Sequence, residues 1–137
     1  MAKLNPYLTF NGNCKEAMTF YKAIFGGELS LMTAGESPVA SQMPPKYHDS
    51  ILHSSLKTDD FEIFATDMVP GAFNEGNTMH LCLVCKSENE IHSLFEKLSA
   101  GGKVNQPVSP MFFGLLGDLT DKFGKSWVLE FDKPNQA

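Results

Sequence analysis

The stretch "NTMHLCLVCKSENEIHSLFEKLSAGGKV", Asn77 to Val104, decides the fold, because it repeats the pattern of "NPYLTFNGNCKEAMTFYKAIFGGEL", Asn5 to Leu29. Each stretch begins with a short run rich in apolar, aromatic and β-branched residues, which is typical of a strand. Each continues with apolar residues at helical spacing and ends at a glycine pair, which stops a helix. The chain therefore contains the same strand–helix unit twice.

Capping signals and apolar spacing predict the two helices. Asn13 and Glu16 have the spacing of a capping box, and Ser87 and Glu90 repeat that box 74 residues further along. Apolar residues then recur on one side of each predicted helix. In the first helix these are Ala17, Phe20, Tyr21, Ile24 and Phe25, and in the second they are Ile91, Leu94, Phe95 and Leu98.

The segments after the two helices also correspond, and the final strands, residues 61–67 and 126–132, end on Asp67 and Asp132. Each half thus has the order βαβββ. The predicted fold class is α+β, with two βαβββ modules in a pseudo-twofold arrangement that form a curved mixed sheet around a cleft, helices outside. We expect one domain over residues 1–137, with module one at about 4–68, a linker at about 69–77 and module two at about 78–133.

Composition argues against several classes of function. A net charge of −5 disfavours nucleic-acid binding. All eleven basic residues are Lys, so the guanidinium fork that grips phosphate or carboxylate is missing. No apolar run reaches about 18 residues, so we expect no membrane span. The first residues lack the apolar core of a signal peptide, and we expect a cytoplasmic protein.

Cys82 and Cys85 form a C-x-x-C pair inside an apolar run. In a strand, side chains three residues apart point to opposite faces. A redox or zinc C-x-x-C is found in a turn or at a helix start, so this pair predicts neither kind of site.

Nearly the whole chain resembles the PhnB-like branch of the vicinal oxygen chelate superfamily, which includes glyoxalase I, bleomycin-resistance proteins and extradiol dioxygenases. The resemblance is carried by Asn5 to Leu29, by "DMVPGAFNEGNTMHLCLVC" at 67–85 and by "MFFGLLGDLTDKFGKSWVLEF" at 111–131. It implies a homodimer. In glyoxalase-type members it also implies a divalent metal held by four side chains, one each from the first and last strands of each half.

At these positions the second half offers His80 and Glu130, whereas the first half offers Pro6 and Ala65, which cannot coordinate a metal. His53 is a candidate third ligand. We expect no cofactor, and the alternative is a divalent metal (Mn, Mg, Fe, Ni or Zn) on these residues. Without a metal, His80 and Glu130 would form a facing pair in a polar cleft, hydrogen-bonded to each other or to water. Such a pair could serve as a general base and its orienter, which makes them the candidate catalytic residues.

Strand alternation predicts which residues line the cleft. Cys82 shares a strand face with His80, and Val128 shares a strand face with Glu130. Pseudo-symmetry adds two residues of the first strand, and the Phe112–Phe113 pair either caps the cleft or, as we favour, packs in the core. The predicted ligand-binding residues are Leu8, Phe10, Cys82, Phe113 and Val128.

Two functions from different classes follow. The first, which we favour, is a protein that binds an unknown small organic molecule in the cleft without a complete metal site. The alternative is a divalent-metal-dependent lyase, isomerase or dioxygenase of the vicinal oxygen chelate type. The sequence leaves open whether the protein is an enzyme.

Overall fold

The computed structural model describes residues 1–134. The chain divides between Asn74 and Glu75 into two compact units, here called unit 1 and unit 2. This division falls within the segment expected to link the modules. Each unit has the order βαβββ and a four-stranded mixed sheet, which confirms the predicted α+β class of two βαβββ modules. No helix in the described part of the chain is long and apolar enough to cross a membrane.

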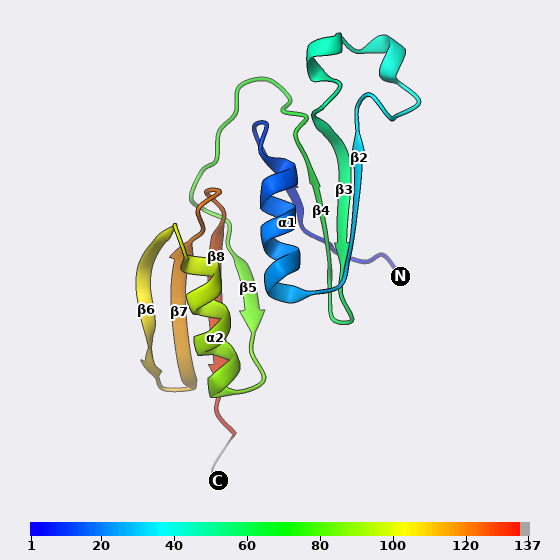
Figure 1. Cartoon of the computed structure of the whole chain (residues 1–137). Helices are drawn as coiled ribbons and strands as arrows, with labels where there is room; N and C mark the ends of the chain where they lie inside the picture. Colours follow the sequence, from blue (N-terminus) through cyan, green and yellow to red (C-terminus); the bar gives the residue numbers. More distant parts are fainter. Residues whose placement is uncertain (135–137) are drawn as a thin grey trace. The chain divides into compact units, whose positions relative to one another are not determined.

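Unit 1 consists of β1 (Tyr7–Thr9), α1 (Cys14–Phe25), β2 (Glu28–Thr33), β3 (Ile51–Lys57) and β4 (Glu62–Thr66). The strand order is β1-β4-β3-β2, in which β1 runs parallel to β4 and the other neighbours are antiparallel. Helix α1 lies along one face of this sheet (Figure 1). Two short 3₁₀ helices, η1 (Ala40–Gln42) and η2 (Pro45–Tyr47), lie between β2 and β3.

Unit 2 consists of β5 (Leu81–Val84), α2 (Glu88–Ser99), β6 (Lys103–Met111), β7 (Gly114–Thr120) and β8 (Ser126–Asp132). Its strand order, β5-β8-β7-β6, repeats that of unit 1, again with the first and last strands parallel. Helix α2 covers one face of its own sheet (Figure 1). The core of each unit therefore lies between one helix and one sheet face.

The helix stripes are largely as predicted, with one shift. In α2, Ile91, Phe95 and Leu98 are buried as expected. In α1 the buried side consists of Cys14, Ala17, Met18 and Tyr21, while Phe20, Ile24 and Phe25 are only half-buried. The buried side of α1 is therefore centred closer to Met18 than predicted. Residues in the middle of the helix–sheet contact are fully buried, whereas those at its margin stay partly exposed.

The two helix starts differ from the predicted capping boxes. The Asn13 side chain makes no capping hydrogen bond. Instead, Asp67 Oδ1 accepts from the N–H groups of Gly12 and Cys14, both at 3.0 Å. A carboxylate is a stronger acceptor for these positively polarised N–H groups than a side-chain amide.

At the second helix, Ser87 Oγ accepts from Glu90 N at 3.0 Å, as a capping box requires. Glu90 Oε1, however, accepts from Lys86 N at 2.9 Å rather than from the cap residue itself. The second capping box therefore forms, but the Glu90 side chain accepts from the residue before the cap instead of from Ser87.

Two glycines fix the start of β2 and β6 at equivalent places. A Cβ on Gly27 would collide with the carbonyl of Lys57, and a Cβ on Gly102 would collide with the carbonyl of Thr120. Each glycine therefore permits a close approach between the strand after the helix and its neighbour. This shared contact identifies Gly27 and Gly102 as structural counterparts.

Candidate functional site

The sheet of unit 2 has one face without a helix, here called the open face of unit 2. Register pairs Leu83 with Leu129 on the helix-covered face, where Leu129 is fully buried. The alternate residues therefore point to the open face. They include Val84, which is 62% exposed, and Cys82, which lies beside Val128. The predicted placement of Cys82 and Val128 on the face of His80 and Glu130 is what the structure has.

A polar network crosses the open face near the start of β5. His80 Nε2 lies 3.6 Å from Asp118 Oδ2. The other oxygen of Asp118 lies 3.3 Å from Asn105 Nδ2, which also donates to Thr120 Oγ1 at 3.0 Å. Asn105 thus restrains the carboxylate that faces the imidazole. The geometry can orient His80, or present a paired donor and acceptor to a polar group of a ligand.

A second group lies further along the same face. Cys82 Sγ donates to Glu130 Oε1 at 3.5 Å. Partial desolvation raises the pKa of the Cys82 thiol although the residue is exposed, and the hydrogen bond to Glu130 adds to the shift. A hydrogen bond with Asp132 raises the pKa of Glu130, and burial adds to that effect, while the bond from Cys82 opposes it. The raised pKa means that Cys82 donates a hydrogen bond to Glu130 and is a poor source of thiolate.

His80 and Glu130 do not form the facing pair expected from the sequence, since His80 meets Asp118 whereas Glu130 meets Cys82. Register explains the separation. Glu130 pairs with Val84, four residues beyond His80 in the chain, which corresponds to roughly 13 Å at the rise of a strand. Side chains stand nearly perpendicular to a sheet, so these two cannot readily converge.

The donor set was tested against the divalent metal that the superfamily implies. Metal–nitrogen and metal–oxygen bonds are about 2.0–2.2 Å long, so ligands must converge on one point. His80 and Glu130 have different partners, and His53 belongs to unit 1, where its ring lies 5.6 Å from that of Phe64. Among residues 1–134 no group of three or more His, Cys, Asp and Glu side chains could hold a metal ion. The candidate ligands do not fit a metal site.

Unit 1 also has a face without a helix, the open face of unit 1, but the residues predicted to line it are wrong. Leu8 pairs with Ala65, which is fully buried beneath the helix, and Phe10 is only 1% exposed. Phe10 belongs to the core, and Leu8 is half-buried on the helix-covered face. The open face instead carries Tyr7, which pairs with Phe64.

The correspondence between the two modules also required correction by one residue. Thr9 pairs with Thr66, and Val84 pairs with Glu130. Glu130 therefore corresponds to Thr66 rather than Ala65, and by the same count His80 corresponds to Asn5 rather than Pro6. For His80 the cause is the connection between the first strand and the helix, which is one residue longer in unit 1 than in unit 2. For Glu130 the cause lies in the turn before the last strand, which holds four residues in unit 1 and five in unit 2.

The Phe112–Phe113 pair forms the turn of the β6–β7 hairpin. Phe112 is fully exposed, so the favoured prediction that this pair packs in the core is wrong for Phe112. Phe113 is half-buried, and its ring packs against that of Phe112 in a T-shaped contact with centroids 5.2 Å apart. Gly114 follows with a φ of 153°, and a Cβ there would collide with the carbonyl of Phe131. Glycine is therefore required beside this exposed turn.

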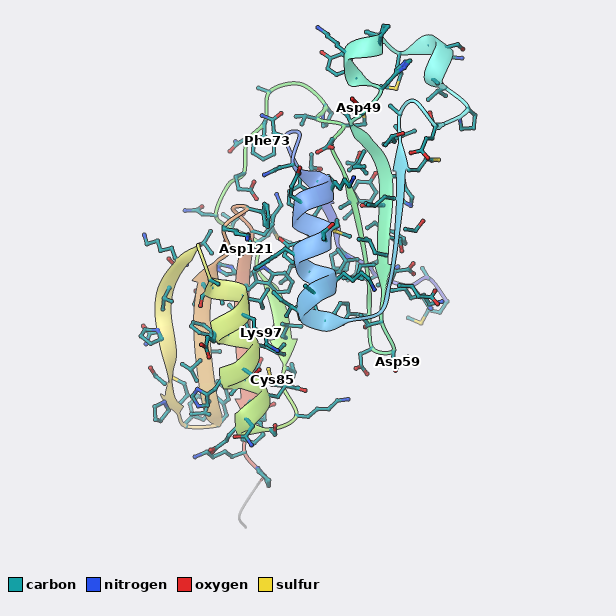
Figure 2. The ribbon with its side chains drawn as sticks, in the orientation of Figure 1. Asp49, Asp59, Phe73, Cys85, Lys97 and Asp121 are labelled. Atoms are coloured by element: carbon teal, nitrogen blue, oxygen red, sulfur yellow. The ribbon has the colours of Figure 1, made fainter. Side chains whose placement is uncertain are left out.

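The C-x-x-C pair is as predicted. Cys82 is exposed, whereas Cys85 is buried at the end of β5, where the chain turns toward α2 (Figure 2). Burial raises the pKa of Cys85 to about 11. Both cysteines are free thiols.

Asp118 and Asn105 were missed by the sequence analysis. They lie on the third and second strands of unit 2, and their approach to His80 depends on the order of strands in the sheet. The alternation along β7, which places Asp118 between two buried positions, is a signal that could have indicated an outward-facing carboxylate.

Comparison with known proteins agrees with this architecture. The chain is 29% identical to Protein YjdN of Escherichia coli (strain K12) over 140 residues, covering 95% of each chain. It is 34% identical to the solved structure of PA1353 from Pseudomonas aeruginosa, with a TM-score of 0.86 and coverage of 98% of this chain and 100% of that chain. The PhnB protein from Bacillus cereus is 28% identical, with a TM-score of 0.74 and coverage of 95% and 99%.

A glyoxalase-related enzyme from Fulvimarina pelagi, 18% identical with a TM-score of 0.64, shares the fold over 96% of this chain and 89% of its own. Residues 2–130 match the family described as 3-demethylubiquinone-9 3-methyltransferase. The chain therefore belongs to this PhnB-like family, which has the fold of the glyoxalase, bleomycin-resistance and dioxygenase superfamily.

Proposed function

We propose that the protein binds a small organic molecule on the open faces of its sheets, without using a complete metal site. The observation that supports this most directly is the open face of unit 2, where Val84 remains 62% exposed beside polar side chains. An apolar surface with a few placed polar groups is the usual composition of a small-molecule site. Exposed apolar side chains on a sheet face otherwise carry a solvation cost that a ligand would remove.

The polar groups of this face determine what kind of molecule it suits. His80 with Asp118 offers one hydrogen-bonding position, and the Cys82–Glu130 pair offers another. Val128 lies between them in register, since it pairs with both Cys82 and Asp118. A molecule with an apolar body and two polar ends would match this order.

The alternative, a divalent-metal-dependent lyase, isomerase or dioxygenase, has less support because His80 and Glu130 have different partners and lie about four residues apart in register. The family description names a methyltransferase acting on a demethylubiquinone. Benzoquinones therefore belong among the molecules tested.

Thermal denaturation with a library of small organic molecules tests the proposal. A ligand present at 100 times its Kd stabilises the folded state by about 2.7 kcal/mol, which is readily detected. Methyl NMR of the same complexes should show shifts at Val84 and Val128. The methyls of Leu98 and Leu129, both in the core, should shift less.

A pair of matched variants locates the site. Val84→Lys places a charge on the open face and is expected to weaken binding at least tenfold. Val104→Lys makes the same change at another exposed valine, 45% exposed, whose register partner Leu119 is on the helix-covered face. Equal loss of affinity in both variants, or a library without any stabilising compound, would contradict the proposal.

A further inference from the structure

The open face of unit 1 carries three rings from three neighbouring strands. Tyr7 lies on β1, Phe64 on β4 and His53 on β3. The Tyr7 and Phe64 ring centroids are 6.5 Å apart, and those of His53 and Phe64 are 5.6 Å apart. Phe64 is the central member, so the three rings form one continuous group, here called the aromatic surface.

The aromatic surface is accessible rather than packed away. Tyr7 is 56% exposed, His53 is exposed and Phe64 is half-buried. The rings are tilted by 46° and 32°. By contrast, Phe25 and Phe61 of the same unit meet edge to face at 88° and 5.3 Å, an arrangement in which one ring covers the other. A ligand can therefore reach the exposed rings of Tyr7 and His53 from solvent.

The charges beside the aromatic surface select among aromatic ligands. Glu62 lies two residues before Phe64 on the same face and accepts from Ser55 Oγ at 2.7 Å. Register places Lys57 beside Glu62 on one side and beside Glu28 on the other. Two carboxylates thus flank one ammonium, and the chain has no Arg to hold an anion. A negatively charged ring is disfavoured here.

From these contacts we infer that Tyr7, His53 and Phe64 form a subsite for a flat, unsaturated ring that is uncharged or cationic. This inference rests on the proposed binding of a small organic molecule and specifies its chemical class. Stacking on ring faces favours a planar π-system over a saturated ring of equal size, and the neighbouring carboxylates favour positive charge.

NMR titration with three probes tests the class of ligand. The probes are N-methylquinolinium, which is flat and cationic, naphthalene-2-sulfonate, which is flat and anionic, and N-methyldecahydroquinolinium, which is cationic and saturated. N-methylquinolinium is expected to shift the ring resonances of Tyr7 and Phe64 and to bind at least tenfold more tightly than the other two. Equal binding of the saturated probe, or tighter binding of the sulfonate, would overturn the inference.

Variants test the residues. Phe64→Leu and Tyr7→Leu are each expected to weaken N-methylquinolinium roughly tenfold, the loss of one good stacking contact. Tyr7→Leu is the safer variant because its ring is largely exposed. Phe112→Leu is the matched control, since it removes an exposed ring that also has an aromatic neighbour, but in unit 2. The affinity of Phe112→Leu for N-methylquinolinium should be unchanged. A loss in Phe112→Leu equal to that in Tyr7→Leu would contradict the assignment of the subsite to the aromatic surface.

The outcomes separate this inference from the function on which it rests. If molecules without rings shift the open faces while N-methylquinolinium does not, the binding function stands and the ring subsite falls. If no compound of either kind shifts any open-face resonance, both fall. Glu62→Gln adds a check on charge: it should weaken N-methylquinolinium and leave uncharged naphthalene unaffected.

Discussion

The indole N–H of Trp127 donates to Asp121 Oδ2 at 2.9 Å inside unit 2. Asp121 is only 3% exposed and lies at the turn between β7 and β8 (Figure 2). Its Oδ1 accepts from the backbone N–H groups of Phe123 and Lys125 at 2.9 and 3.0 Å. One carboxylate therefore joins the turn to the largest side chain of the core.

Asp121→Asn should destabilise the protein. The remaining carbonyl oxygen can still serve the turn, but the new NH₂ group would face the Trp127 indole N–H, and two donors cannot bond. Loss of a buried hydrogen bond with an unsatisfied donor costs about 1–3 kcal/mol. Urea denaturation followed by the fluorescence of Trp127 measures the change.

Asp59→Asn is the matched control for that substitution, because Asp59 is exposed at the corresponding turn of unit 1. A change at an exposed turn residue is expected to stay within about 0.5 kcal/mol. Equal free energies of unfolding for Asp121→Asn and the wild-type protein would show that the carboxylate does not stabilise the turn.

Glu130→Gln should make Cys82 more reactive near neutral pH. Desolvation raises the pKa of the Cys82 thiol most, and the Glu130 carboxylate raises it further by accepting its hydrogen and by its negative charge. An amide removes the charge, so the thiolate forms at lower pH. The rate of iodoacetamide modification at Cys82, followed by peptide mass spectrometry across pH, should rise at a lower pH than in the wild-type protein.

Cys14 and Cys85 provide an internal reference in that experiment, because both are buried and should react slowly in the folded protein. Asp118→Asn changes another carboxylate of the open face and should leave the Cys82 profile unaltered. An unchanged pH profile of Cys82 modification in Glu130→Gln would show that Glu130 does not raise the pKa of the Cys82 thiol.

Glu130→Gln should also change how stability depends on pH. The pKa of Glu130 is raised in the folded state, chiefly by its hydrogen bond with Asp132. A carboxyl with a raised folded pKa binds its proton more tightly when folded, so its favourable contribution is present below the unfolded pKa of about 4.3 and is lost as pH rises through the folded pKa. The amide cannot ionise, so the variant should gain Tm relative to wild type as pH rises above that range.

For this pH series, Glu96→Gln is a suitable comparison, since Glu96 is exposed on α2. Its Tm relative to wild type should not show the same pH dependence. A Glu130→Gln protein whose Tm difference stays constant from pH 4 to neutral would argue against a raised pKa.

Gly27→Ala should destabilise unit 1 more than Gly71→Ala. Both glycines have a φ of 87°, so both alanines carry the same strain of a left-handed backbone. Only at Gly27 would the new Cβ also collide with the Lys57 carbonyl, whereas Gly71 has nothing within 4 Å. Chemical denaturation of the two variants isolates the collision, and equal losses of stability would mean that the strands separate easily at this point.

His48→Ala should loosen residues 33–50. The Nε2 of His48 lies 3.0 Å from the carbonyl of Ala40 and 3.1 Å from that of Met43. Carbonyls only accept, so Nε2 carries the hydrogen and holds the two 3₁₀ helices together. Limited proteolysis should cut this segment faster in His48→Ala. His92→Ala, which removes an exposed histidine of α2, should leave the rate unchanged.

The sequence by itself determined the duplicated βαβββ order, both helices and the opposite faces of Cys82 and Cys85. Those features depend on local capping, glycine placement and the period of apolar residues, all of which are encoded in neighbouring positions. It also placed Val128 and Glu130 on one face of their strand, because alternation along a single strand is a local property.

Only the tertiary structure decided which side chains meet. Asp118 reaches His80, and Asp67 caps α1, across strands that lie far apart in the chain. Leu8 and Phe10 were assigned to the wrong face because a connection in unit 1 is one residue longer, and a shift of one residue turns a strand's side chains to the opposite face. Register between strands is set by packing and backbone hydrogen bonds of the whole sheet, so no single segment contains it.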